Sequence, residues 1–445
     1  MTSSRRSLAA FVLLAFFILG SFQSAHAFPA FARKYGLRCS ACHEAWPMLN
    51  AFGQKFKDNG YQLMDDRDSP IWQNNGYWPV TFRITPYWHR DSTDKVSTDQ
   101  ASTGQQKVTI NGFDLSGLDI LSGGTIYKNI SFLMVPSADE TGAFHFESVN
   151  VRFDNVAHSS WLNFKMGKFE LDNLVSEKRE ITLSGNGANY LIYHFIPATC
   201  AGCADDSNVF GQVGDNQLGV EWLGHSYDDR TRISATLMST NDGNVDLPTN
   251  SYGGFFAASQ AFDAGKLGLQ RVGFYAMVGQ SPTYYLTSGG TPLGFGSLGN
   301  KTFTREGFVG LFYLGKLDFQ VVTQHGEDDA FLATGTAANT ALPTGARNAT
   351  WNGGLVETHY VYNPQLIFIQ RYDWVRMSQQ ATPGTPSTLG NMDQLTFGYR
   401  YYPFMTSRAG LAWHNEYSWL RQRGMAPDGT DLTTGTLMLG LDFDF

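Results

Sequence analysis

The sequence predicts an all-β fold, a transmembrane barrel of about 16 antiparallel strands over residues 80–445, behind a small N-terminal α-helical segment. The composition supports this fold class, because the chain has 47 Gly, 33 Phe, 20 Tyr and 10 Trp and only 16% of its residues are charged. Apolar and polar residues alternate along short runs after Trp78. Beyond the leader, no apolar run is long enough to be a membrane-spanning helix. These features are typical of strands whose outer surface faces lipid.

Residues 1–27 have the features of a signal peptide. Two arginines precede the apolar run Leu8–Gly20, and Ala25–Ala27 supplies an A-x-A cleavage site. The run is shorter than the roughly 20 residues that a spanning helix needs. We therefore expect the mature chain to begin at Phe28 and to be exported, with the bacterial outer membrane as the destination of its barrel.

Three runs indicate most clearly that the expected strands have two different faces. They are Lys316–Gln324, Gln394–Tyr402 and Ala409–Trp419. In the last run, large apolar residues such as Trp413 alternate with polar residues such as His414. The runs are about 9–13 residues long, which is what a tilted strand needs to cross a bilayer.

The connections between the runs alternate between short and long. Short ones lie near residues 225–229, 262–266, 314–316, 363–364 and 404–407, whereas long ones cover residues 281–302, 326–350, 378–391 and 422–432. Short periplasmic turns and long outer loops are the expected asymmetry of an outer-membrane barrel.

Parity then determines the strand number. About seventeen strand-like runs follow the N-terminal segment, yet a bacterial single-chain barrel has an even number of strands. Short turns before the run near 160–169 and after the run near 216–224 make these two runs consecutive strands. Residues 170–215 then form one long loop over or into the lumen, and Tyr190–Phe195 within it does not cross the bilayer. The prediction is sixteen strands.

The C-terminal run Thr436–Phe445 alternates as well, with its apolar residues on one face and Phe445 as the last residue of the chain. It resembles the closing strand of outer-membrane barrels. In that family a terminal aromatic residue serves as the assembly signal.

Residues Cys39–His43 read Cys-Ser-Ala-Cys-His, the C-x-x-C-H pattern of a c-type haem attachment site. Two thiols at this spacing can add to the two haem vinyl groups, and His43 is then held beneath the iron as an axial ligand. A thioredoxin-like motif needs a βαβ setting, and a zinc site needs a second ligand pair nearby; the sequence offers neither. It therefore predicts one covalent haem c, attached to Cys39 and Cys42.

The stretch that follows the motif, Glu44–Leu63, has helical periodicity. Trp46, Leu49, Phe52 and Phe56 recur at spacings of three and four residues. We expect a helix whose aromatic side chains pack a small core and also line the haem.

Several residues are candidates for the sixth iron ligand. Met48 is expected to be too close to His43 on the same helix. Met64 is far enough along the chain to complete a His/Met iron. His89 from the barrel and His194 from the long loop are competing donors, and an open sixth position is the remaining alternative.

A second C-x-x-C pair, Cys200 and Cys203, is not followed by histidine. We expect a disulfide there, because the chain is exported to an oxidising compartment. A weak metal site that includes His194 is the alternative.

Polar residues of the barrel are expected to face the lumen; they include Arg152, Arg232, Asp318, Arg371, Asp373, Arg400, His414 and Glu416. No nucleophile–base pair, phosphate loop or carboxylate metal cluster is recognisable among them, so no catalytic residue is predicted. The formal net charge of −8 and the lack of a basic cluster exclude a nucleic-acid partner.

The haem motif, the barrel and the closing strand together resemble the fused monohaem c-type cytochrome–porins of bacterial outer membranes. Phe31–Tyr61 is similar to the family's haem segment and Val80–Phe445 to its barrel, and only Cys39, Cys42 and His43 match as functional residues. That group includes outer-membrane cytochromes that oxidise extracellular Fe(II). The resemblance implies an electron conduit between an extracellular donor or acceptor, with Fe(II) as the expected donor, and a periplasmic c-type cytochrome or other redox carrier. As an enzyme it would be an Fe(II):cytochrome c oxidoreductase.

Two other functions stay open at this point. One is a diffusion porin in which the haem segment is a plug or a sensor. The other is a peroxidase-like haem enzyme, which would need an open sixth position on the iron.

Overall fold

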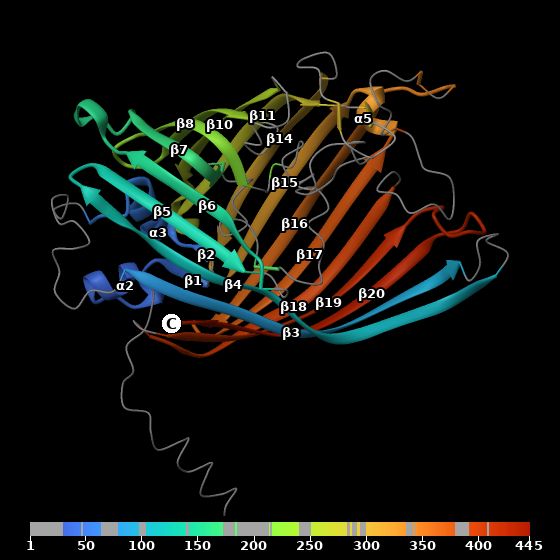
Figure 1. Ribbon diagram of the computed structural model, residues 1–445. Helices are drawn as coiled ribbons and strands as arrows, with labels where there is room; N and C mark the ends of the chain where they lie inside the picture. The colour runs from blue at the N-terminus through green and yellow to red at the C-terminus, as the bar shows by residue number, and fades with distance from the viewer. Residues whose placement is uncertain are drawn as a thin grey trace, which may run out of the picture.

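The computed structural model describes residues 30–45, 48–63, 79–97, 104–138, 142–171, 183–184, 213, 216–239, 251–282, 285–286, 292–293, 300–334, 341–342, 344–378, 391–406 and 409–445. Its main feature is a closed barrel of sixteen antiparallel strands (Figure 1). This number confirms the prediction from parity. Within the described residues, no helix is long and apolar enough to cross a membrane.

Each barrel strand pairs with the next one along the chain, and the last strand pairs with the first. The strands are β3 (Val80–Ser97), β4 (Gln105–Tyr127), β5 (Ile130–Ala138), β6 (Phe144–Phe153), β7 (Asn163–Glu170), β8 (Asn216–His225), β9 (Thr231–Ser239), β10 (Tyr252–Asp263), β11 (Leu269–Pro282), β14 (Asn300–Leu314), β15 (Leu317–Asp328), β16 (Ala349–Asn363), β17 (Leu366–Met377), β18 (Met392–Met405), β19 (Gly410–Gln422) and β20 (Leu432–Asp444). The connections contain the short pair β12 (Tyr285–Leu286) and β13 (Pro292–Leu293), the helix α5 (Ala330–Thr334) and the 3-10 turns η2 (Val156–His158) and η4 (Gly265–Leu267).

Strand β19 illustrates the two faces of the wall. Trp413 and Tyr417 are 46% and 49% exposed on the outside, whereas His414 and Glu416 between them are buried on the inside. The same alternation continues around the barrel, where exposed Phe, Tyr, Trp and Leu side chains form the outer surface. An apolar, aromatic exterior is what a barrel in a bilayer requires, and the predicted alternation is confirmed.

One end of the barrel, called the short-turn end below, carries brief connections at residues 128–129, 154–162, 226–230, 264–268, 315–316, 364–365 and 406–409. The connections at the other end are mostly longer, and the longest joins Glu170 to Asn216. Strands β7 and β8 pair directly, from Asn163 opposite Leu223 to Glu170 opposite Asn216. The wall therefore has no further strand between them. Tyr190–Phe195 belongs to none of the barrel strands and lies outside the described residues.

The barrel closes where β20 meets β3. The backbones of Phe82 and Phe445 exchange two hydrogen bonds of 3.0 and 2.9 Å. Their rings stack with centroids 5.3 Å apart, and the Phe443 ring also stacks on Phe445, with centroids 5.5 Å apart. The terminal aromatic residue thus packs on the seam of the barrel at its short-turn end.

The chain before the barrel is called the N-terminal segment below and covers residues 30–63. It contains α2 (Ala30–Tyr35), the 3-10 turn η1 (Cys39–Ala41), a two-stranded hairpin of β1 (His43–Ala45) and β2 (Met48–Leu49), and α3 (Ala51–Asp58). The single helix predicted over Glu44–Leu63 is therefore wrong in its first part. Asn50 caps α3 by accepting a 2.9 Å hydrogen bond from the Gly53 amide, so the helix begins only at Ala51. Figure 1 shows this segment at the end of the barrel where the C-terminus lies.

Candidate functional site at the short-turn end

The N-terminal segment crosses the lumen of the barrel. Helix α3 lies against β6 and β9, as its ion pairs and hydrogen bonds show. Beyond it, the carboxyl group of Glu44 on the hairpin lies beside that of Asp318 on β15. Met48 is 1% exposed and packs in a cluster with Ile369 of β17 and Tyr402 of β18. Because β16–β19 lie half the circumference away from β6–β9, the segment spans the mouth from wall to wall.

Arg152 of β6 attaches the end of α3 to the wall. Its guanidinium donates hydrogen bonds to the carbonyls of Lys57 and Asp58, at 2.8 and 3.2 Å. It also pairs with Asp154 at 3.0 Å, and both side chains are almost completely buried. The last carbonyls of a helix lack partners within the helix, so a cation placed there satisfies them and favours the negative end of the helix dipole.

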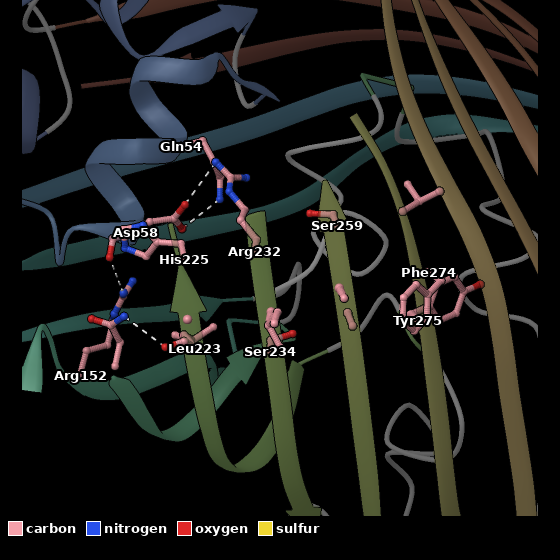
Figure 2. Close-up of a pocket in the computed structure, with 16 residues that line it drawn as sticks. Gln54, Asp58, Arg152, Leu223, His225, Arg232, Ser234, Ser259, Phe274 and Tyr275 are labelled. Atoms are coloured by element: carbon pink, nitrogen blue, oxygen red, sulfur yellow. Dashed lines mark hydrogen bonds and ion pairs between the residues drawn. The ribbon is translucent and has the colours of Figure 1, made fainter. Parts of the chain in front are cut away.

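Arg232 of β9 makes the second attachment. Its guanidinium pairs with Asp58 at 3.2 Å, and Gln54 one turn earlier donates to the same carboxylate at 3.1 Å. Figure 2 shows these side chains beside His225, at one edge of a pocket between α3 and strands β8–β11. The sequence predicted Arg152 and Arg232 as lumenal residues. It did not identify Asp58 as their partner, although Asp58 is the acidic residue that ends the helical run.

The C-x-x-C-H motif lies where η1 passes into the hairpin. The Cys42 side chain is partly buried and its thiol is free, and His43 is 9% exposed. Nothing is described of the Cys39 side chain. The Asn50 side chain donates to the Ala41 carbonyl at 3.0 Å, and the Asn50 amide donates to the Cys42 carbonyl at 2.9 Å. The cap of α3 therefore also holds the backbone of the motif.

Helix α3 approaches the motif closely at Gly53. A Cβ atom added there would lie 2.0 Å from the carbonyl oxygen of Cys42, which is backbone and cannot turn away. Only glycine permits this approach, and it fixes the distance between α3 and the Cys42–His43 backbone.

The residues of the motif fit a covalently bound haem by the chemistry of their side chains. A thiol on Cys42 and an imidazole on the next residue are present in one short stretch, with Cys39 three positions before the thiol. Burial raises the pKa of the Cys42 thiol to about 11, so the thiol is protonated at neutral pH. A buried, protonated thiol is a poor partner for disulfide exchange, which argues against a redox C-x-x-C. Among the described residues, no group of three or more His, Cys, Asp or Glu is arranged to hold a metal ion directly.

An aromatic cluster supports this segment. Phe31 of α2 stacks on Tyr61 with ring centroids 5.0 Å apart, and Phe56 of α3 meets Phe31 and Tyr35 edge to face at 5.3 and 5.7 Å.

The sequence predicted a different set of aromatic and apolar residues. Of that set, Phe56 is buried, Phe52 is 45% exposed, Leu49 belongs to β2 and Trp46 lies outside the described residues. Phe31, Tyr35 and Tyr61 were missed, because they pack across two separate helical pieces.

The candidates for a sixth iron ligand are distributed over the chain. Met64 and His194 lie outside the described residues. Met48 is not on a helix with His43, contrary to the prediction, because the two residues are on opposite strands of the hairpin.

His89 is the candidate from the barrel wall. Its ring forms a 2.7 Å hydrogen bond with the Asp91 carboxylate. It lies opposite Met438 in the pairing of β3 with β20, several residues along the strand from the short-turn end.

Two described residues of the long loop, Leu183 and Ser184, reach the same part of the lumen. The Leu183 amide donates to Glu357 of β16 at 2.6 Å, and Arg400 of β18 donates to the Leu183 carbonyl at 3.0 Å. The Ser184 hydroxyl donates to Glu416 of β19 at 3.1 Å.

The long loop also contacts the N-terminal segment. Leu183 packs in the cluster that contains Met48, so the loop and the segment meet at this wall. Cys200 and Cys203 lie outside the described residues.

The other predicted lumenal residues, which include Asp318, Arg371, Asp373 and His414, are buried on the inner face. Arg371 pairs with Asp373 at 2.6 Å, and His414 pairs with Glu416. They form a polar wall opposite α3. These residues do not include a nucleophile placed beside a base.

Sequence reasoning missed His359, which is 1% exposed and forms a 2.6 Å hydrogen bond with Glu357. The polar alternation of β16 was the available signal for it.

The fold is similar to those of solved outer-membrane proteins. An anion-selective porin from Comamonas acidovorans matches with a TM-score of 0.51 and 11% identity, over 82% of this chain and 98% of its own. A loop-deletion mutant of OmpT, an outer membrane protein of Vibrio cholerae, matches with a TM-score of 0.49 and 12% identity, over 82% and 99% of the two chains. The outer membrane channel DcaP of Acinetobacter baumannii matches with a TM-score of 0.48 and 10% identity, over 82% and 97%.

No protein-family model matches the sequence, and neither does any curated protein. At these low identities the likeness to solved structures is one of fold alone. The closed barrel of sixteen strands, its apolar exterior and this likeness give one conclusion: the chain has the fold of a sixteen-stranded outer-membrane β-barrel.

Proposed function

We propose that this barrel carries one covalent haem c in its short-turn mouth and passes single electrons between the two sides of the outer membrane. The observation that carries the proposal is the position of the motif. Cys42 and His43 belong to a segment that spans the lumen and is attached to opposite walls. A diffusion channel has no need of a C-x-x-C-H stretch at that place.

In this proposal, Cys39 and Cys42 attach the haem by thioethers and His43 binds the iron. Haem c supplies reversible one-electron chemistry when bound. The chain's own residues position it. Gly53 and Asn50 hold the backbone of the motif against α3, and Arg152 and Arg232 hold α3 against the wall.

The barrel supplies a path for electrons across the outer membrane, which the lipid bilayer does not. A bilayer has a hydrocarbon core of about 30 Å, which separates a donor outside from a carrier in the periplasm. An extracellular donor, Fe(II) in the proposal, loses one electron and becomes Fe(III). A periplasmic cytochrome gains that electron at the short-turn end. The lumenal position of the N-terminal segment supports such a path, because it keeps the motif away from lipid and inside the lumen that joins the two aqueous spaces.

The second candidate is a diffusion channel in which the N-terminal segment is a plug. The comparisons favour this candidate over the conduit, because a solved structure that matches with a TM-score of 0.51 is named an anion-selective porin. The polar inner wall is compatible with it as well. The structure adds that a solute would have to pass the N-terminal segment and the Leu183–Ser184 contact.

One experiment separates the two candidates. The purified protein is placed in liposomes that enclose a redox dye, and Fe(II) is added outside. We expect the dye to be reduced by the wild type and not by Cys39→Ala. The matched control is Ser40→Ala, which changes the neighbouring residue and keeps the attachment pattern. Equal dye reduction by wild type and Cys39→Ala would refute the conduit. Swelling of the same liposomes in a small sugar, unaffected by Cys39→Ala, would instead establish the diffusion channel.

A further inference from the structure

The short-turn end of the barrel is basic, although the whole chain has a formal net charge of −8. The basic residues there are Lys34, Arg38, Lys55 and Lys57 on the N-terminal segment and exposed Lys128, Arg230, Lys266 and Lys316 on or beside the turns. Most carboxylates of this end are paired with arginines. Within its described part, Asp58 and Asp229 pair with Arg232, Asp154 pairs with Arg152, and Asp442 pairs with Arg83. The exposed pair Asp228 and Asp263 bond Arg230 and the Gly265 amide.

Two exposed aromatic side chains lie at this basic end. Tyr227, in the turn between β8 and β9, is 83% exposed, and Phe52 is 45% exposed. The Lys55 ammonium lies 5.8 Å from the centre of the Tyr227 ring. Phe52 is three residues before Lys55, so the two side chains share one face of α3. Phe52, Lys55 and Tyr227 therefore form one continuous patch.

The patch continues to the haem motif itself. The Asn50 side chain donates to the carbonyls of Ser40 and Ala41, at 3.4 and 3.0 Å, which keeps η1 beside the first turn of α3. Arg38 and Ser40 are exposed there. The Gln62 side chain donates to the Lys128 carbonyl at 3.3 Å, so exposed Lys128 also lies beside the N-terminal segment. We call Arg38, Ser40, Phe52, Lys55, Lys128 and Tyr227 together the mouth surface.

We propose that the mouth surface docks the acidic face of a small electron-carrier protein. The inference rests on the proposed function, because a carrier is needed only if the motif holds a redox group. Aromatic residues at the centre with Arg and Lys around them are the composition of protein-binding surfaces. Excess positive charge on one side steers a negatively charged partner and raises its association rate. Docking there would bring the carrier beside the residues Cys39–His43.

Charge alone would also suit anionic lipid headgroups, but position argues against them. Arg38, Lys55 and Phe52 are on the segment that fills the mouth, whereas lipid contacts the outer wall of the barrel. A protein that covers the mouth can reach the whole mouth surface, and a bilayer around the barrel cannot.

The test is a binding measurement on the full chain in detergent micelles, with the acidic soluble domain of cytochrome b5 as the probe. We expect the double variant Lys55→Glu, Lys128→Glu to lower the association rate at least tenfold at about 10 mM salt, where screening is weak. The difference should shrink as salt is raised to about 0.5 M. The matched control is Lys107→Glu, which reverses a 62% exposed lysine on the strand β4 near the other end. Tyr227→Ser should weaken binding at both salt concentrations, since it removes apolar contact rather than charge.

The outcomes distinguish this inference from the proposed function. Charge-dependent binding without electron transfer to the probe supports the docking surface and contradicts the conduit. Electron transfer at the same rate in wild type and Lys55→Glu, Lys128→Glu supports the conduit and overturns the docking surface. Binding to phosphatidylglycerol vesicles that is lost in the double variant, without binding to the cytochrome domain, also overturns it.

Discussion

Gly53 is a residue at which the C-x-x-C-H motif and helix α3 approach each other closely. A methyl group there would overlap the Cys42 carbonyl oxygen, so α3 and the motif would have to separate. We expect Gly53→Ala to destabilise the N-terminal segment by about 1–3 kcal/mol, the usual range for overpacking. The result should be a lower yield of covalently attached haem and faster proteolysis near residues 51–63. Haem staining after denaturing electrophoresis and limited proteolysis measure both effects.

The matched control for this substitution is Gly112→Ala. Gly112 lies in β4, and an added Cβ there would meet nothing within 4 Å. This variant should attach haem and resist proteolysis as the wild type does. If Gly53→Ala also behaves as the wild type, the packing of α3 on Cys42 is wrong.

At the scale of elements, α3 is held by the two arginines of the wall. Arg152→Ala removes two hydrogen bonds to the helix and leaves Asp154 buried without its cation. Breaking a buried ion pair from one side costs about 3–5 kcal/mol. We therefore expect α3 to leave the mouth for part of the time and single-channel conductance to rise well above that of the wild type. Planar-bilayer recording measures this.

Arg421→Ala is the control for the conductance experiment, because Arg421 pairs with Asp431 beyond the other end of β19 and is 41% exposed. It should leave the conductance unchanged. If Arg152→Ala conducts no better than Arg421→Ala and the wild type, Arg152 does not hold α3 in the mouth.

The long loop is a second inserted element, and Glu357 anchors it. Its carboxylate accepts hydrogen bonds from the amides of Leu183 and Ser184 at 2.6 and 3.3 Å. Hydrogen bonds to a charged group contribute about 1.5–3 kcal/mol each. We expect Glu357→Ala to speed amide hydrogen exchange at residues 183–184 by about ten- to a hundredfold, since each 1.4 kcal/mol is about a factor of ten. Glu306→Ala, on an exposed position of β14, should leave that exchange unchanged.

For the whole molecule, the repeating parts of the fold were predictable from sequence. Alternation predicted which side of β19 faces lipid, because Trp413 and His414 obey a local period of two that the wall imposes everywhere. Parity predicted the pairing of β7 with β8 across the long loop. Phe445 was expected to end the closing strand, and it packs on Phe82 at the seam.

The parts inside the barrel were less predictable, because they depend on contacts between distant residues. Leu183 is bound by Glu357 and Arg400, which are far away in the chain and offer no local pattern.

The hairpin of β1 and β2 has apolar residues at helical spacing, although the Asn50 cap marks the start of α3 only at Ala51. A proline after Trp46 was a further signal, since the residue before a proline avoids helical geometry. The partners of Asp58 could not be assigned before the strands were placed around the lumen.

The central claim is that an iron-bearing group is held in the mouth at the short-turn end. The most direct measurement is the paramagnetic effect of haem iron on a spin label, placed either at Tyr227→Cys in a short turn or at Asp428→Cys in the loop between β19 and β20. Cys200 and Cys203 are replaced by serine in both variants, so that only the new thiol is labelled. We predict strong relaxation enhancement at residue 227 and little at residue 428, because the two ends of the barrel are separated by the thickness of the membrane. Equal effects at both positions, a stronger effect at residue 428, or no paramagnetic effect at either would contradict the claim.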